Sequence, residues 1–213
     1  MFLNKSIAFG LFMGILSINQ SYAGAFPGNN FLGKKVPNTR FVYTHVSIPF
    51  ACRSLIIDSM TAWNNVGANI SMTWGGYADY NSWNQSIGQS TPTSNNTANM
   101  SVEMGGVNNI NAVAEAPYLF STSTTTLKNG DKVKNIRDSD IVLNVNKSSN
   151  FWCSNSPPPS GKFDIKTALM HEMGHTWGLD HDNVNLPALM QPVLGYFLAP
   201  TAKDISRMKY LHP

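Results

Sequence analysis

The clearest hydrophobic periodicity in this chain runs through residues 54–67 and has the spacing of a helix. Ser54 stands where an N-cap would, and Gly67 is placed to end the helix. One face of this amphipathic helix is expected to be buried. Its apolar positions are Leu55, Ile56, Met60, Trp63 and Val66.

Alternating apolar and polar positions predict strands on both sides of that helix. Residues 40–48, RFVYTHVSI, are rich in β-branched and aromatic side chains. Residues 68–74 would place Ile70, Met72 and Trp74 on one face. Shorter strand-like segments follow at residues 100–104, 111–120 and 140–145.

Three segments lack such a pattern. Residues 24–39 are expected to form an irregular arm, and residues 150–162 contain three consecutive prolines that exclude regular structure. Residues 75–100 are dominated by Asn, Ser, Thr and Gly and predict a long surface loop. A tight turn is expected at Asn129 and Gly130. Aromatic residues of the long loop could instead bind a carbohydrate or peptide, namely Tyr77, Tyr80 and Trp83.

Composition fits one exported domain. The chain has 213 residues, of which only 13% are charged, about half the usual share, while uncharged polar residues are abundant. The formal net charge is +3, and it would fall to +2 on removal of an N-terminal segment that contains Lys5. That charge is too small to favour nucleic acid or anionic lipid as a partner.

The N-terminal sequence predicts export directly. Lys5 precedes an apolar run at residues 7–18, and small residues at Ser21 and Ala23 form a cleavage site. The alternative of a membrane anchor needs roughly 20 apolar residues, which this run does not provide. Residues 1–23 are therefore expected to be a signal peptide, with no membrane anchor left after cleavage.

The chain has two cysteines, Cys52 and Cys153. In an exported protein an even pair predicts a disulfide. The alternative is a thiolate that binds a metal as a built-in inhibitor, and pairing would exclude it.

A second helix carries the candidate chemistry. Asp164 can cap it, and four residues advance a side chain only about 40° past a full turn, so His171 and His175 should point the same way. Gly178 can end the helix in a left-handed conformation, which would let His181 supply a third nitrogen.

Three neutral imidazoles without a thiolate favour zinc with one coordination position open, as in catalytic sites. Zinc would lower the pKa of a water molecule there, and the neighbouring Glu172 could act as general base. The alternative, three histidines buried in a core, would leave their nitrogens in need of other partners.

Residues 171–181, HEMGHTWGLDH, resemble the complete HExxHxxGxxH signature of the metzincin zinc endopeptidases. Met190 in PALMQP follows nine residues after His181, where that family has its methionine turn. Within the metzincins the chain is most similar to the matrixins, whose closing helix resembles residues 201–213. The resemblance implies an α/β (α+β) catalytic domain over residues 24–213, with a twisted, mixed, mostly parallel sheet of about five strands and about three helices.

The chain departs from the matrixin pattern in two respects. Asp182 follows the third histidine, where matrixins more often have Ser, and is typical of the adamalysin branch. An inhibitory PRCGxPD segment is missing, so activity after export would need no proteolytic activation.

A further metal site is expected to be absent. Many matrixins hold a second, structural zinc through three histidines and an Asp, but only His45 and His212 remain here. His45 is expected to be a structural residue of its strand. Calcium could bind carboxylates of the 131–140 region, although ordinary solvated side chains are the favoured interpretation. These are Asp131, Asp138 and Asp140.

The resemblance also implies where a peptide would bind. The strand at 111–120, including Ala112, Val113 and Ala114, would pair with an extended substrate. Residues after Met190 would wall the pocket that follows the scissile bond, namely Pro192, Val193 and Leu194.

The sequence as a whole predicts a secreted, monomeric zinc metalloendopeptidase that acts on proteins or peptides. Two alternatives remain. One is an exported zinc hydrolase of a non-protein amide, and the other is a surface-binding protein with a structural metal.

Overall fold

A five-stranded sheet forms the centre of the computed structural model, which describes residues 31–78, 99–183 and 187–213. Its strand order is β3-β2-β4-β8-β5. The first four strands pair in parallel, and β5 pairs with β8 antiparallel. The mixed, mostly parallel sheet is therefore confirmed. The bounds are β2 Thr39–His45, β3 Ser71–Ala78, β4 Asn99–Gly105, β5 Ala114–Glu115 and β8 Ile141–Asn144.

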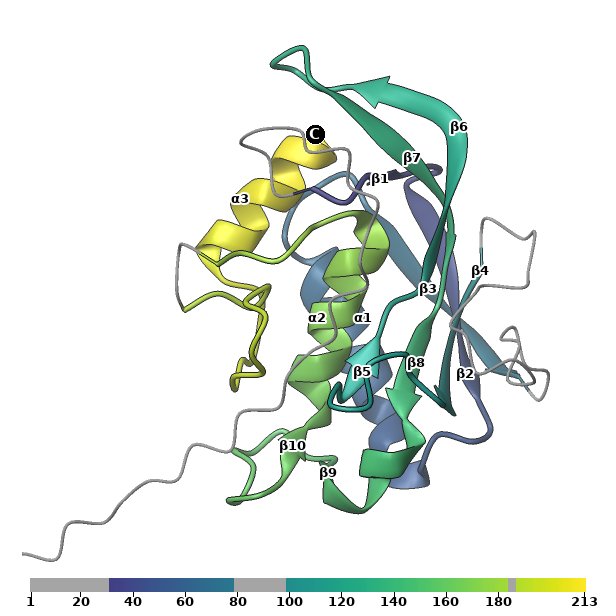
Figure 1. Cartoon of the computed structure of the whole chain (residues 1–213), viewed down its shortest axis with the longest axis vertical. Helices are drawn as coiled ribbons and strands as arrows, with labels where there is room; N and C mark the ends of the chain where they lie inside the picture. Colours follow the sequence, from purple (N-terminus) through teal and green to yellow (C-terminus); the bar gives the residue numbers. More distant parts are fainter. Residues whose placement is uncertain (1–30, 79–98, 184–186) are drawn as a thin grey trace, which may run out of the picture.

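Two smaller sheets flank the first. One has the order β1-β7-β6, and its long hairpin, seen at the top of Figure 1, turns at Gly130, where φ is 89°. The Leu127 N–H donates to the Asp131 carbonyl across that turn at 2.7 Å. The other sheet pairs β9 with β10. The bounds are β1 Lys34–Lys35, β6 Tyr118–Thr126, β7 Lys132–Ser139, β9 Phe151–Trp152 and β10 Phe163–Asp164.

The helices pack around an apolar core on one side of the main sheet (Figure 1). Trp63 of α1 is fully buried, and its indole N–H donates to the Met170 carbonyl of α2 at 2.8 Å. This bond fixes the two helices to each other. The bounds are α1 Arg53–Asn64, α2 Ile165–Trp177 and α3 Ala202–Leu211, with short 3-10 helices at Phe50–Cys52 and Val145–Asn150.

The predicted disulfide is confirmed. Cys52 and Cys153 are paired, with Cα atoms 4.7 Å apart, and the bridge joins the start of α1 to the segment after β9. A thiolate ligand to a metal is thereby excluded. Within the described residues, every helix is too short or too polar to cross a membrane.

Several predicted elements need correction. Helix α1 begins at Arg53, with Cys52 and not Ser54 as its N-cap. It ends at Asn64, before the predicted end at Gly67. Neither segment predicted as irregular is wholly so, because β1 at Lys34–Lys35 pairs with the distant β7, and β9 at Phe151–Trp152 pairs with β10. Residues 111–120 form two strands rather than one, since the chain leaves β5 after Glu115 and enters β6 at Tyr118.

The strand at 68–74 also differs from its prediction. β3 continues to Ala78, so the expected loop does not begin at residue 75. Trp74 was expected to be buried on the same face as Met72, but its side chain is 41% exposed. The pairing of β3 with β2 shifts its register next to Trp74, between Val42 and Tyr43 of β2. Tyr77 is 56% exposed. Tyr80, Trp83 and the predicted signal peptide lie outside the described residues.

Candidate metal centre

Helix α2 presents the histidines because both of its ends are defined by the residues expected from sequence. Asp164 caps the first turn by accepting from the Thr167 N–H at 3.1 Å. Gly178 ends the helix in the left-handed region, with φ of 108°. A Cβ at Gly178 would collide with the Gly33 carbonyl, so both conformation and space require glycine there.

Three imidazole nitrogens converge on one point. The Nε2 atom of His171 lies 3.0 Å from that of His175 and 3.1 Å from that of His181, and the remaining pair is 3.3 Å apart. Tetrahedral zinc, with Zn–N bonds of about 2.0–2.1 Å, needs nitrogens roughly 3.3 Å apart. Among the described residues this is the one group of three or more His, Cys, Asp or Glu side chains close enough to share an ion.

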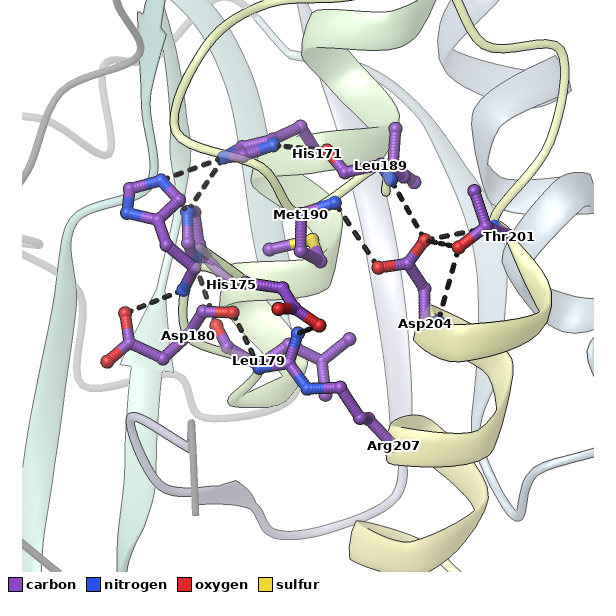
Figure 2. Close-up of polar contacts among 11 residues, drawn as sticks. His171, His175, Leu179, Asp180, Leu189, Met190, Thr201, Asp204 and Arg207 are labelled. Carbon is purple, nitrogen blue, oxygen red and sulfur yellow. Dashed lines mark hydrogen bonds and ion pairs between the residues drawn. The ribbon is translucent and has the colours of Figure 1, made fainter. Parts of the chain in front are cut away.

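Carbonyl groups fix which nitrogen of each helical imidazole faces the centre. His171 Nδ1 lies 2.7 Å from the Leu189 oxygen, and His175 Nδ1 lies 2.7 Å from the Leu179 oxygen (Figure 2). Each Nδ1–H donates to its carbonyl, which leaves the Nε2 lone pair free to bind a cation. The donor set therefore fits zinc.

Burial keeps these imidazoles neutral. Desolvation, together with the neighbouring His181, lowers the pKa of His171 from 6.5 to about 3. The pKa of His175 is well below its ordinary value, and that of His181 is also lowered, in both cases mainly by burial. Neutral rings bind a metal without first losing a proton.

His181 reaches the cluster through the turn after α2. The Leu32 N–H donates to the Gly178 carbonyl at 2.8 Å, and Leu179 N–H donates to the Gly174 carbonyl at 3.0 Å. The Asp180 carboxylate accepts from the His181 N–H at 2.7 Å. These bonds fix the path that carries the third imidazole back toward the helix.

Met190 is fully buried beside the histidines (Figure 2). Its carbonyl accepts from the Asp182 N–H at 2.8 Å. The carboxylate of Asp204, on α3, accepts from the Leu189 N–H at 2.9 Å and from the Met190 N–H at 3.2 Å. The methionine segment is thus attached both to the His181 turn and to α3.

Glu172 is also buried, next to His171 on α2. Burial raises the pKa of this carboxyl well above its usual value, and the nearby Glu115 raises it further. The nearby Ala116 backbone partly offsets those effects on the pKa. The Glu172 side chain on α2 is therefore close to Glu115 of β5 and to the backbone of Ala116, which follows β5.

No family model matches the chain, and no curated protein matches it.

The predicted substrate strand is the edge of the main sheet, where β5 pairs with β8 alone. Ala112, Val113 and Ala114 are fully buried, so their side chains belong to the core. Any contact with a peptide would have to use backbone groups, although both backbone polar groups of Ala112 and the Val113 carbonyl already form hydrogen bonds, with Asn109 and Asn144. Pro192 and Val193 are partly buried in the segment that follows Met190.

The carboxylates considered for calcium are not all solvated, contrary to expectation. Asp138 and Asp140 are buried near the cations of Lys35 and Arg40. Burial raises the pKa of Asp140 to about 7, against the effect of the Ser101 N–H that donates to it at 2.7 Å. They form a buried charge cluster with the two cations, whereas Asp131 lies partly exposed in the hairpin turn.

The remaining histidines have structural contacts. His45 Nδ1 lies 2.7 Å from the Ser47 hydroxyl, and His212 Nε2 lies 2.9 Å from the Trp177 carbonyl. Sequence reasoning missed Glu115, whose carboxylate accepts from the Asn108 and Asn109 N–H groups. A single glutamate in a short apolar segment carries no sequence signal of such a role.

Proposed function

We propose that this protein is a secreted zinc metalloendopeptidase of the metzincin type, most similar to the matrixins. The proposal rests on the convergence of three Nε2 atoms, at 3.0–3.3 Å, and on a buried glutamate on α2, the helix that carries two of the three histidines. The disulfide supports an oxidising, extracellular setting.

Zinc bound there would lower the pKa of a water molecule and polarise the scissile carbonyl. Glu172 would take the proton from the attacking water and pass it to the leaving amine. A glutamate beside an open coordination position has a chemical role that a purely structural metal site does not need.

The peptide would bind in extended form along the backbone of β5, the edge of the main sheet. Pro192 and Val193 would wall the pocket for the side chain after the scissile bond. This arrangement would recognise main chain more than side chain, so we propose proteins and peptides as substrates.

The test compares the wild-type protein, exported and purified, with Glu172→Gln on casein and on a peptide library. We expect kcat/KM to fall about 10²–10⁴-fold, the usual loss for a general base, with zinc content unchanged. The control Asp131→Asn removes a carboxylate from the β6–β7 turn and should keep wild-type activity and zinc.

Two outcomes would contradict the proposal, the first in its mechanism and the second in its substrate. Equal activity of wild type and Glu172→Gln would remove Glu172 from the chemistry. Zinc in the wild type without cleavage of any peptide would favour hydrolysis of a non-protein amide, or surface binding with a structural metal.

A further inference from the structure

His181 is the one ligand of the histidine cluster that α2 does not carry. Its imidazole reaches the other two only if the turn from Gly178 to Asp182 keeps its shape. The helical hydrogen bonds end with that from the Leu179 N–H to the Gly174 carbonyl, and the Asp182 N–H already donates to another segment, at the Met190 carbonyl.

Arg207 of α3 contacts this turn on both sides of His181. Its Nη2 donates to the Asp180 carbonyl at 2.7 Å, just before the ligand, and its Nη1 lies 4.0 Å from the Asp182 carboxylate, just after it. Figure 2 shows Arg207 extending from α3 toward Asp180. The planar guanidinium can hold two such groups at a fixed separation.

The surroundings of Arg207 favour a fixed position. Asp182 is fully buried, the Arg207 side chain is only 9% exposed, and its guanidinium carbon lies 5.9 Å from the centre of the Phe31 ring. Asp204, one turn earlier on α3, holds the Met190 segment. Helix α3 thus contacts both the Met190 segment and the turn that carries His181. These contacts can hold the His181 imidazole in a fixed position.

We propose that Arg207 is a positioning residue of the metal centre, which holds His181 in place and so slows loss of the bound ion. The inference rests on the metal-binding part of the proposed function and not on peptide cleavage. Metal ligands supported by such outer contacts commonly lose 10–100-fold in affinity when the contact is removed.

The experiment uses the full chain, processed by an exporting host, with Arg207→Met, Arg207→Lys and the control Lys203→Met. Lys203 is an exposed cation on the same helix, so its replacement also removes one positive charge from α3. The rate of zinc loss to excess chelator is measured, and Co²⁺ is substituted so that its visible absorption reports ligand geometry.

We expect Arg207→Met to lose zinc about tenfold faster than wild type and to show an altered Co²⁺ spectrum. Arg207→Lys keeps the positive charge but loses the planar guanidinium, so its rate of zinc loss should lie between those of wild type and Arg207→Met. Lys203→Met should lose zinc at the wild-type rate. The Co²⁺ spectrum separates positioning from a general loss of stability, because overall destabilisation leaves the ligand set of the folded protein unchanged.

Zinc loss at the wild-type rate from folded Arg207→Met would overturn the inference. If Arg207→Met does not fold, Arg207→Lys decides, and a wild-type rate and spectrum there would overturn the inference. Failure of the wild type to bind zinc would instead overturn the proposed function, and this inference with it.

Discussion

Gly174 shows at the scale of one residue how the sequence makes room for the metal centre. It lies on α2 between Glu172 and His175, and a Cβ there would collide with Met190 Sδ and lie 3.1 Å from the Trp63 ring. Both neighbours are fully buried. The missing side chain therefore allows Met190 to lie directly against the helix that carries two ligands.

Replacement of Gly174 by Ala should therefore destabilise the protein, by about 1–3 kcal/mol for overpacking, less the gain in helix propensity. Met190→Ala should cost less in the Gly174→Ala background than alone, because the added methyl partly fills the cavity. Urea unfolding of the zinc-free protein measures both effects. Gly106→Ala is the control, since a Cβ there meets nothing within 4 Å. Strict additivity of Gly174→Ala and Met190→Ala would contradict direct packing.

The spacing of residues along the sequence was enough to predict those site residues that lie close together in the chain. His171, His175 and Glu172 lie within one helical turn and a half, so the helix period brings them together. The residues that support them are distant in sequence. Asp204 and Arg207 reach the site only because α3 packs beside the His181 turn, and no local pattern encodes that contact.

At the scale of elements, prediction succeeded where a hydrophobic period coincided with caps. Helix α2 has both, with Asp164 at one end and Gly178 at the other. The β6–β7 hairpin was largely missed beyond its turn, because residues 121–126 are Ser and Thr without an apolar face. Pairing between the strands, rather than burial of one face, stabilises that part of β6.

The end of α3 provides a pH-dependent contact between elements. His212 is fully buried, and its Nε2 donates to the Trp177 carbonyl at the end of α2. Burial lowers the pKa of His212 from 6.5 to about 4. Between these pH values the unfolded chain binds a proton at His212 that the folded protein does not. The stabilising contribution of His212 is thus complete above about pH 6.5 and is lost as the pH falls toward 4.

His212→Gln should weaken this acid sensitivity, because glutamine can donate to the same carbonyl and does not titrate. The difference in slope should be at most about 1.4 kcal/mol per pH unit. Urea unfolding of zinc-free wild type and variant between about pH 7 and 4.5 measures it, and the ligand histidines contribute equally to both. The same slope in both proteins would contradict a buried neutral His212.

At the scale of the whole molecule, the fold class followed from the sequence, whereas the division into separate sheets did not. Arg40 of β2 is buried and donates to the Ser139 carbonyl of β7 at 2.5 Å, so a charged side chain joins the two larger sheets. Hydrophobic patterns cannot predict such a link. Together with the Cys52–Cys153 bridge, it supports the frame on which α2 holds the histidines.

In the proposed function, His171, His175 and His181 together hold one zinc ion. Zinc K-edge X-ray absorption on the purified protein tests it most directly. We predict about one zinc per chain, with nitrogen ligands from three imidazoles at about 2.0–2.1 Å and no sulfur ligand. A chain that binds no zinc, or one with sulfur at about 2.3 Å in the coordination shell, would contradict zinc binding by these three histidines.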